Sequence, residues 1–237
     1  MKKLVSGSLE LGVRLTKRQL EMFELYYEEL TIWSKKMNIT SIKEYHAVEL
    51  KHFLDSLTPA SVFPVKYLDS CRIIDIGSGA GFPGLPLKIV FPDMDVTLVE
   101  SNKRKSLFLR RVIKVLELSH VEVHNDRAEV LGLDEALRER FDVVFSRAVD
   151  RLPSVVELTL PFCRMGGVVV AFKKGDIEQE LEESLNAIEL LGGALKERRK
   201  VRVSGLGDNR VLVVMEKIRL TPSIYPRRPG IPRKRHL

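Results

Sequence analysis

The sequence predicts an α/β fold in which a doubly wound, mostly parallel sheet closes with an antiparallel hairpin and carries an N-terminal helical cover. Three features of the chain support this prediction. Strand-like and helix-like segments alternate from residue 72 onward, as a parallel sheet with helical crossovers requires. The last two strand-like segments follow each other with no helix between them. Residues 1–64 instead carry apolar side chains at helical spacing.

The elements of the sheet follow from the hydrophobic period and the turn residues. Strands are expected at 72–76, 95–100, 120–124, 141–146 and 167–172, and helices at about 84–91, 102–117, 134–140, 153–162 and 176–191. Leu195–Val203 and Arg210–Glu216 are expected to pair as a hairpin around the loop 205–209. This plan is typical of Rossmann-like class I methyltransferases, whereas dinucleotide-binding folds end in a parallel strand.

Two helices are expected before the sheet. Thr16 and Gln19 resemble a capping box, and Ser41 with Glu44 is expected to cap a second helix. We interpret both helices as a packed cover, because an apolar stripe at helical spacing is usually core rather than a surface for stacking bases. The expected organisation is a cover at 1–64, a cofactor-binding core at 65–217 and a basic tail at 218–237, all within one compact unit.

The composition is that of a soluble globular protein. The chain has 237 residues, of which 44% are hydrophobic, enough for one sizeable core. No apolar run reaches the length of about 18 residues that a membrane span needs, and the N-terminus lacks a secretory segment, so we expect a cytoplasmic protein without a membrane partner. Cys71 and Cys163 lack the spacing of metal ligands, so neither a disulfide framework nor a metal site is expected.

Positive charge is concentrated at the C-terminus. The formal net charge is +7, and residues 217–237 contain seven Lys or Arg and no acid, so the rest of the chain is balanced. Prolines stiffen the run 225–232, which suits an extended arm that binds phosphates, with Arg227, Arg228 and Lys234 as candidate RNA contacts. A solvated, disordered terminus is the alternative. A second candidate patch, or a solvated helix face, comprises Lys103, Arg104, Lys105, Arg110 and Arg111.

The most informative motif is IIDIGSGAGFPG at 73–84, in which a strand ends in Asp75 and enters a glycine-rich turn. Such a turn marks a nucleotide-cofactor pocket, because glycine lets the backbone approach a ligand closely. Gly79, Gly81 and Gly84 also fit the dinucleotide pattern, but a pyrophosphate beside Asp75 would face a like charge. S-adenosylmethionine, which carries a sulfonium and an ammonium, fits better. A purely structural turn is the remaining alternative.

Polar groups also follow the later strands. Glu100 ends the second strand and can accept hydrogen bonds from both ribose hydroxyls of a cofactor, although alone it would more simply favour the start of the next helix. The segment 126–129 offers a carboxylate and backbone N–H groups to an adenine edge. The segments 146–149 and 172–175 follow the fourth and fifth strands, and Arg147 stands where a methyl acceptor should approach.

Residue types that are missing from these strand ends restrict the acceptor. Enzymes that methylate an adenine amino group carry Asp or Asn followed by Pro-Pro and an aromatic residue where this chain has Ser-Arg-Ala-Val. Methylation of a pyrimidine carbon needs a cysteine nucleophile near the end of the fourth strand, whereas Cys71 precedes the first strand and Cys163 precedes Gly166-Gly167. A ring nitrogen such as guanine N7 has a free lone pair and no proton to lose, so it needs no general base, only positioning and desolvation, which agrees with the lack of a catalytic His or Cys.

Together these residues resemble the RsmG family, also called glucose-inhibited division protein B. The resemblance spans nearly the whole chain and rests on IIDIGSGAGFPGLPLKIVFP at 73–92, Asn38-Ile39-Thr40, HFLDSL at 52–57, Ser146-Arg147-Ala148 and YPRRPGIPRK at 225–234. It implies an S-adenosylmethionine-dependent enzyme that methylates N7 of one guanine in 16S rRNA. The implied partner is 16S rRNA or the small ribosomal subunit, and we expect a monomer without a metal.

The resemblance also implies where the site lies. With the residues of the motif, the expected cofactor site comprises Asp75, Gly77, Gly79, Phe82, Glu100, Ser101, Asn102, Ala128, Glu129 and Arg147. The resemblance adds Lys173 to the RNA contacts and implies that Asn38, His52 and Asp55 line the acceptor side. A buried Asp55 that binds a helix end is the simpler interpretation. Small departures from the family pattern are Ile39, where leucine is expected, and His236, where proline is common.

Three other functions stay open on the sequence alone. One is a methyltransferase that acts on a protein or a small molecule, which would leave the basic tail without a partner. Another is a nicotinamide-dependent reductase that uses the same glycine turn. The third is an RNA-binding assembly factor without catalysis, which the full set of polar strand ends disfavours.

Overall fold

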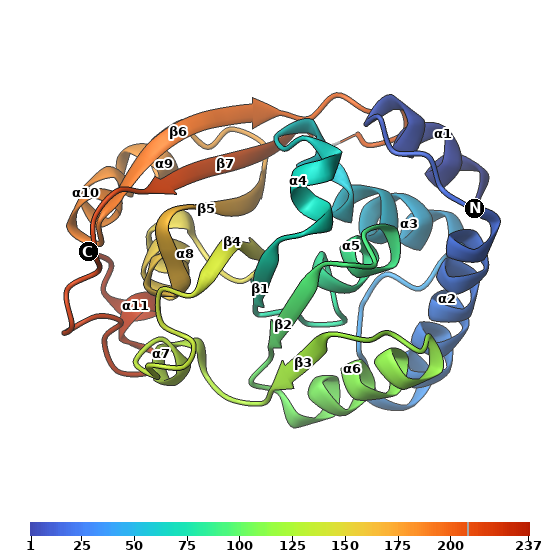
Figure 1. The fold of residues 1–237 in the computed structure, drawn as a ribbon, viewed down its shortest axis with the longest axis horizontal. Coiled ribbons are helices and arrows are strands. Elements are labelled where there is room, and N and C mark those ends of the chain that lie inside the picture. The colour runs from blue at the N-terminus through green and yellow to red at the C-terminus, as the bar shows by residue number, and fades with distance from the viewer. Residues whose placement is uncertain (208) are drawn as a thin grey trace.

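The structure, a computed structural model, describes residues 1–207 and 209–237. Among them seven strands form one sheet in the order β3-β2-β1-β4-β5-β7-β6 (Figure 1). Their bounds are β1 Arg72–Ile76, β2 Asp95–Val99, β3 Val121–His124, β4 Phe141–Arg147, β5 Cys163–Lys174, β6 Gly193–Lys200 and β7 Arg210–Lys217. The strands β1 to β5 run parallel, and β7 pairs antiparallel with both β5 and β6. The predicted doubly wound sheet with its closing hairpin is confirmed; the predicted hairpin loop includes Asp208, which lies outside the described residues.

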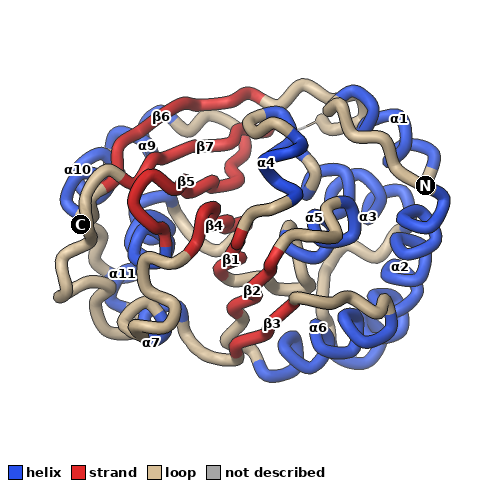
Figure 2. Tube along the Cα trace, in the orientation of Figure 1, coloured by secondary structure: helices blue, strands red, loops and turns tan. Residues whose placement is uncertain are grey.

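Helices cover both faces of the sheet, and the strands run between them (Figure 2). One face carries α1 Lys2–Glu10, α2 Lys17–Met37, α3 Tyr45–Val48, α5 Gly84–Val90 and α6 Lys103–Val115. The other carries α7 Ala128–Leu131, α8 Leu152–Thr159, α9 Glu178–Glu182, α10 Leu185–Leu190 and α11 Ile231–Lys234. Alternate residues of a strand point to opposite faces, so Val143 and Phe145 join the first core and Val144 the second. Short helical segments also occur at α4 Val65–Asp69, at a π-helix Glu49–Leu54, and at 3₁₀ turns Thr58–Ser61 and Leu160–Phe162.

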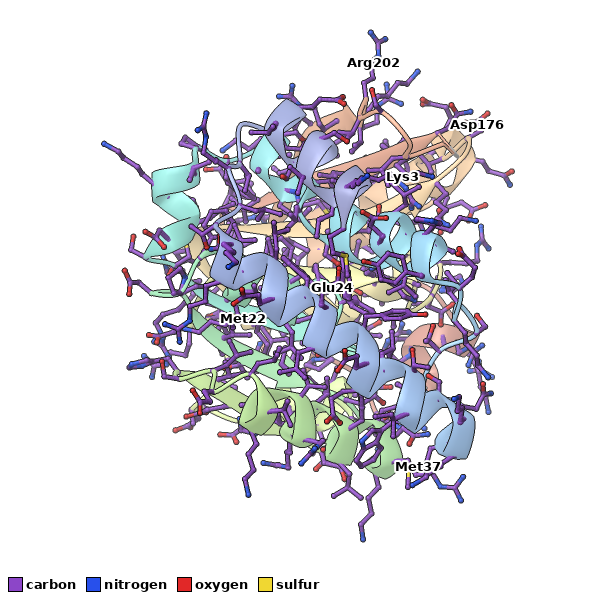
Figure 3. The ribbon with its side chains drawn as sticks, turned by 90° about the vertical axis from the view of Figure 1, so that its right-hand side faces the viewer. Lys3, Met22, Glu24, Met37, Asp176 and Arg202 are labelled. Carbon is purple, nitrogen blue, oxygen red and sulfur yellow. The ribbon has the colours of Figure 1, made fainter. Side chains whose placement is uncertain are left out.

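The N-terminal helices pack over α5 and α6. In Figure 3, α2 runs diagonally across this side of the molecule, with Met22 and Met37 towards its two ends. The predicted capping box is confirmed: Thr16 N donates to Gln19 Oε1 at 2.9 Å, and Gln19 N donates to Thr16 Oγ1 at 3.3 Å. Gln19 Nε2 also donates to the carbonyls of Ile89 and Val90, each at 3.0 Å, which ties the start of α2 to the end of α5.

Two local predictions for the cover were incomplete. The helix α1 was not expected, because Gly7 and its serine neighbours are weak helix formers. Its start is stabilised from a distance: Glu49 Oε1 accepts from the amides of Lys3 and Leu4 at 2.7 and 3.0 Å. The expected Ser41 cap was wrong, since Glu44 itself caps α3 by accepting from His46 N and Ala47 N.

The helix expected at 134–140 was also wrong. The helix α7 lies earlier, and 135–139 forms turns. Glu139 takes a left-handed φ of 53°, and its amide donates to the carbonyl of Pro161 rather than continuing a helix. Arg138 points to the C-terminal segment, where it donates to the carbonyls of Tyr225 and Thr221. These tertiary contacts outweigh the helical propensity of the local sequence. The helix expected at 176–191 is divided into α9 and α10.

The C-terminal segment is packed against the body of the protein. We call residues 221–237 the strap. In Figure 1 it lies beside α7 and α8, and its short helix α11 contacts α8. The expected free, extended arm is therefore not what the structure shows. The division of the chain into cover, core and tail stays a prediction.

A buried tyrosine tests whether cover and sheet unfold together. Tyr26 Oη donates to the carbonyl of Ala80, and the ring packs on Phe53 and Phe82 with centroids 5.4 and 5.6 Å apart. In Tyr26→Phe the Ala80 carbonyl loses this donor, so the free energy of unfolding should fall by about 1–3 kcal/mol. Urea unfolding should still show one transition.

The adjacent Tyr27 supplies a matched control. Its hydroxyl donates to the carbonyl of Lys43 at 3.3 Å in an exposed position. Tyr27→Phe should change stability by less than about 0.5 kcal/mol. Equal effects of the two variants would contradict the proposed importance of the Tyr26 contact, and two separate transitions would contradict a single folding unit.

Candidate active site

The predicted site residues gather where the sheet changes its winding direction. The chain passes from β1 outward to β2 and β3, then returns to the other side of β1 as β4. Ligands of open α/β sheets bind beyond the carboxyl ends of the strands at this point. The glycine loop 77–84 follows β1 there, and Arg147 ends β4 beside it.

Two adjoining cavities open at this edge. The cover cavity, of about 290 Å³, lies between the glycine loop and the helical cover, and is lined by the expected residues Gly77, Gly79, Phe82, Glu100 and Arg147. The strap cavity, of about 140 Å³, lies between the β3–α7 segment and the strap, and is lined by the expected residues Gly77, Ser101, Ala128 and Glu129. Gly77 and Val149 line both cavities. Taken together they reach the range of roughly 300–1,000 Å³ that small-molecule ligands occupy.

Six of the seven backbone N–H groups of the loop 77–84 have acceptors within the protein; the exception among the described residues is that of Ala80. Gly77 N and Ser78 N donate to the carbonyl of Val99 at 2.9 and 3.0 Å. Further acceptors within 3.1 Å serve the amides of Gly79, Gly81, Phe82 and Gly84. A loop that binds a pyrophosphate instead presents such N–H groups to the ligand. The geometry therefore disfavours the dinucleotide alternative.

Glu100 is held in place at the end of β2. Its Oε2 accepts from Gly79 N at 2.9 Å, and its Oε1 accepts from Asn102 N at 2.7 Å. A carboxylate offers about four lone-pair positions, so capacity remains for two ribose hydroxyls. Asn102 caps α6, since its Oδ1 accepts from Arg104 N at 2.9 Å, and it lines neither cavity. Its contact with a ribose stays a prediction.

Asp75 lies behind the loop and not in either cavity. It is fully buried; Oδ2 accepts from Gly84 N at 3.1 Å, and Oδ1 has no partner among the described residues. Burial raises the pKa of Asp75 to about 7, although the Gly84 N–H and the Arg147 charge oppose this shift. The carboxyl thus braces the turn between β1 and α5, and a direct contact with a cofactor stays a prediction.

Arg147 is fixed by the cover. Its Nε contacts Asp55 Oδ2 at 3.0 Å, and its Nη1 donates to Ser56 Oγ at 3.4 Å. The carbonyl of Lys51 accepts from Nη2, and the guanidinium carbon lies 5.7 Å from the centre of the Phe82 ring. The side chain is only 13% exposed. Burial lowers the pKa of Arg147 and the charge of Asp55 opposes this, so the site holds a fixed cation at the end of β4.

His52 forms a neutral wall of the cover cavity. Its ring stacks on Phe82 with centroids 4.3 Å apart and planes 17° apart. Because the guanidinium of Arg147 can only donate, Nδ1 of His52, 3.2 Å from Nη2, must accept, and Nε2–H then donates to Thr40 Oγ1 at 2.9 Å. Burial, with the nearby Arg147 charge, lowers the pKa of His52 to about 3. His52 is therefore a poor general base.

The strap closes the second cavity. Glu129 Oε1 accepts from Gly230 N at 2.8 Å, and Gly230 and Pro232 line the cavity opposite Ala128. Sequence reasoning assigned the strap to RNA alone and missed these wall residues. The glycine in YPRRPGIPRK was the feature of the sequence that could have indicated these wall residues. In the structure Gly230 takes a left-handed φ of 83°, which brings its amide to Glu129.

Of the expected RNA contacts, two are engaged inside the protein. Lys173 Nζ donates to Glu180 Oε1 at 2.6 Å and to the Asp150 carbonyl at 3.1 Å, and Arg227 pairs with Glu157. Arg228 and Lys234 are exposed. In the second candidate patch, Arg110 donates to Val123 O, Arg111 binds Glu29, and Lys105 lines the cover cavity. All these RNA contacts stay predictions.

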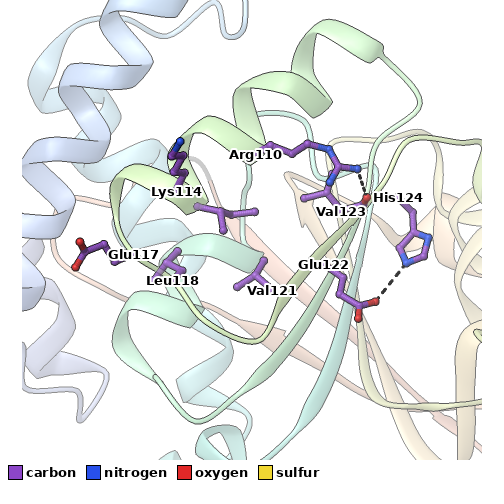
Figure 4. A pocket seen from close by; sticks show the side chains of 9 residues that line it. Arg110, Lys114, Glu117, Leu118, Val121, Glu122, Val123 and His124 are labelled. Atoms are coloured by element: carbon purple, nitrogen blue, oxygen red, sulfur yellow. Dashed lines mark hydrogen bonds and ion pairs between the residues drawn. The ribbon is translucent and has the colours of Figure 1, made fainter.

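A separate groove of about 620 Å³ lies between α6 and the edge strand β3 (Figure 4). There Arg110 Nη2 donates to the carbonyl of Val123 at 2.6 Å, and His124 lies 3.6 Å from Glu122. None of the expected cofactor residues lines it. The groove opens on the outer edge of the sheet and is not part of the candidate site.

Within 1–207 and 209–237, no three His, Cys, Asp or Glu side chains are grouped so as to hold a metal ion. Over the same residues, each helix is too short or too polar to cross a membrane.

The solved structures that resemble this chain share its fold. A branched-chain polyamine synthase mutein from Thermus thermophilus superposes with a TM-score of 0.58 at 15% identity, covering 83% of this chain and 64% of its own. The Methanococcus jannaschii fibrillarin pre-rRNA processing protein gives 0.51 at 16% identity, covering 66% of this chain and 70% of its own. At such identities the likeness concerns the fold alone.

The sheet order and the antiparallel hairpin are those of the Rossmann-like class I methyltransferase fold. Residues 19–205 match the family model described as GidB, rRNA small subunit methyltransferase G. A protein named ribosomal RNA small subunit methyltransferase G from Dehalococcoides mccartyi is 45% identical over 234 residues, which is 99% of this chain and 98% of the relative. One of the same name from Bacillus cereus is 44% identical, covering 95% and 93%.

This chain belongs to the rRNA small subunit methyltransferase G family. The predicted resemblance is confirmed, and so is the predicted enzyme class. The methyl donor of the family is S-adenosylmethionine, which is the predicted cofactor. The two adjoining cavities, the free lone pairs of Glu100 and a glycine loop whose amides mostly bind acceptors within the protein fit this group.

Gly77 allows a direct test of the cavity junction. A Cβ at this position would lie 2.5 Å from Val149 Cγ2, whereas a Cβ at Gly79 would meet nothing closer than 3.8 Å; φ is positive at both. Gly77→Ala should weaken S-adenosylhomocysteine binding by about tenfold or more, equivalent to about 1.4 kcal/mol, in calorimetry. Gly79→Ala has the same backbone strain without the clash, so it should lose less affinity for S-adenosylhomocysteine. Equal losses of affinity in the two variants would show that the cofactor does not pass from one cavity to the other at Gly77.

Asp75 predicts a pH dependence of stability. Since its pKa is raised from 3.8 to about 7, the folded protein binds this proton more tightly than the unfolded chain does. The stabilisation is fully present below the unfolded pKa and is lost as the pH rises through about 7. In urea unfolding, Asp75→Asn should therefore gain stability relative to wild type between about pH 4 and about pH 7, and the difference should level off at higher pH.

The exposed Asp93 provides the control for this measurement. Asp93→Asn should keep a constant difference from wild type over the same range. A constant difference for Asp75→Asn as well would mean that the carboxyl of Asp75 is already ionised at the lower pH.

Proposed function

We propose that this enzyme transfers the methyl group of S-adenosylmethionine to N7 of one guanine in the 16S rRNA of the small ribosomal subunit. One observation carries the choice of a ring nitrogen: the cover cavity joins the glycine loop to Arg147, and its described lining holds no thiol and a neutral His52. Cys71 and Cys163 are buried elsewhere, and burial raises the pKa of their thiols to about 11 and about 12. Neither a thiol nucleophile nor a strong base is thus placed at the acceptor.

The cofactor would extend across both cavities. Ala128 and Glu129 would contact the adenine in the strap cavity, with Glu100, Ser101 and Asn102 beside the ribose. Gly77, Gly79 and Phe82 would hold the methionine part, and Asp75 would support their loop from behind. When bound, S-adenosylmethionine supplies an electrophilic methyl group.

The protein's own residues would then position the guanine and exclude water. N7 has no proton to lose, so its lone pair needs only in-line placement. Arg147 has five N–H donors, and its contacts with Asp55, Ser56, Lys51 and His52 account for four of them. The remaining N–H, on Nη1, is available to the guanine O6, which would leave N7 free to react.

We further propose that RNA approaches over the exposed cations. Arg228 and Lys234 are exposed on the strap and would contact phosphates directly. Lys173 and Arg227 were expected to do the same, and their internal ion pairs favour an indirect role that holds α9 and the strap in place. The enzyme would act in the cytoplasm, as a monomer and without a metal, which is consistent with a ribosomal substrate.

The proposed reaction can be tested by the product. Small subunits or 16S rRNA are incubated with methyl-labelled S-adenosylmethionine, then treated with borohydride and aniline, which cleave RNA at N7-methylguanine. We expect label in 16S rRNA and one cleavage site. Label without cleavage would contradict the N7 assignment, and no label in either substrate would contradict the rRNA methyltransferase assignment.

A pair of arginine variants connects this test to the site. Arg147→Ala should reduce the rate by about 10²-fold or more, because the acceptor loses its positioning group. Arg72→Ala is the matched control, since Arg72 is exposed at the opposite end of β1 and should leave the rate unchanged. Melting temperatures of both variants would separate a lost contact from a lost fold, and equal rates would remove Arg147 from the proposed site.

A further inference from the structure

The strap supplies one wall of the cavity that would hold the adenine. Gly230, Pro232 and Arg233 line the strap cavity together with Ala128 and Glu129 of the β3–α7 segment. The two sides of this cavity are about a hundred residues apart in the chain. The strap cavity is therefore complete only when the C-terminus is docked.

A buried ion pair anchors the strap to α8. Glu157 is 1% exposed on its side chain, and its Oε1 accepts from Arg227 N at 2.8 Å and from Arg227 Nε at 2.9 Å. Its Oε2 accepts from Nη2 of the same arginine at 2.5 Å. Arg227 Nη2 also donates to the carbonyl of Arg235 at 2.7 Å, which closes the strap on itself. Removing Arg227 would leave a buried carboxylate without its cation, which is strongly unfavourable.

Other contacts fix the strap on both sides of this anchor. Before it, Arg138 donates to the carbonyls of Thr221 and Tyr225 at 2.8 and 2.7 Å. After it, Ser154 Oγ on α8 donates to the carbonyl of Pro232 at 3.1 Å. The backbone at Gly230 is thus held between two attachment points.

The result of this arrangement is a hydrogen bond inside the cavity. Gly230 N donates to Glu129 Oε1 at 2.8 Å, and Glu129 is buried to 7% exposure. The bond orients the carboxylate, which keeps Oε2 for a ligand. At the rim, Arg233 Nε lies 3.4 Å from Asp150 Oδ2 and links the strap to the loop after β4.

We propose that the strap is part of the cofactor site, and that Arg227, Glu157 and Gly230 are positioning residues for Glu129 and the adenine. This inference rests on the proposed function and deepens it. The strap also exposes Arg228 and Lys234 on its outer side, so the segment that would bind rRNA also shapes the cofactor pocket. Cofactor binding and RNA binding then act on one segment, so any effect of one on the affinity of the other is reciprocal.

Calorimetry with S-adenosylhomocysteine tests the inference on the full-length protein. Arg227→Ala and Glu157→Gln should each weaken binding by about tenfold, the size of one lost hydrogen bond to a charged group. Arg235→Ala is the matched control: it removes the same charge from the same strap, and its exposed side chain lies outside the anchor, so affinity should stay within about twofold of wild type. In methyl transfer, the anchor variants should raise KM for S-adenosylmethionine more than they lower kcat.

A milder variant covers the case in which the anchor variants fail to fold. An added Cβ at Gly230 meets no atom within 4 Å, so Gly230→Ala changes only the backbone, which has a φ of 83° there. It should weaken S-adenosylhomocysteine binding while lowering the urea midpoint less than Arg227→Ala does. In wild type, hydrogen exchange at the Gly230 amide should slow when S-adenosylhomocysteine is added.

The outcomes separate this inference from the proposed function. Equal affinities of wild type, Arg227→Ala and Gly230→Ala, or an unchanged Gly230 exchange rate, would overturn the role of the strap alone. Tight S-adenosylhomocysteine binding without rRNA methylation would count against the proposed acceptor and leave the strap result valid. Wild type that does not bind S-adenosylhomocysteine would overturn both.

Discussion

The arrangement of the site depends on one buried carboxylate, Asp55. Its two oxygens lie 3.0 Å from Arg147 of β4 and 3.0 Å from Arg210 of β7, so one acid of the cover holds cations from two strands. In a buried position each charge depends on the others, because removing one leaves its partner uncompensated at a cost of about 3–5 kcal/mol. This ion-pair group keeps the cover against the strand ends, and the cover cavity lies between them.

The glycine loop is likewise held by contacts within the protein. Its amides donate to Val99, to Ser78, to Glu100 and to Asp75, so the protein itself holds most of the loop. A phosphate-binding loop would instead keep these donors free. Two acids brace the turn from behind and from the side, and the surface that faces the cavity offers carboxylate acceptors. Such a surface suits a ligand with hydroxyls and positive charge.

Much of the site was predictable because its residues follow strands directly, and parallel strands bring their carboxyl ends to one edge. Gly77, Glu100 and Arg147 met for this reason. The prediction was less accurate where long-range partners decide local structure. Glu49 accepts hydrogen bonds from the first amides of α1. Arg138 holds the turns at 135–139 against the strap, and Glu157 binds the strap to α8. None of these pairs has a signature in the local sequence.

The sequence by itself determined the fold class, the family and the cofactor loop, because strand period, helix capping and turn glycines act over a few residues and can be read along the chain. Only the tertiary structure decided which charged residues are exposed. Burial and pairing depend on neighbours that are distant in the chain, so Arg227 and Lys173 could not be told from Arg228 and Lys234 by composition. For the same reason Asp75 proved to be a brace behind the loop, since the direction of a carboxyl is set by the packing around it.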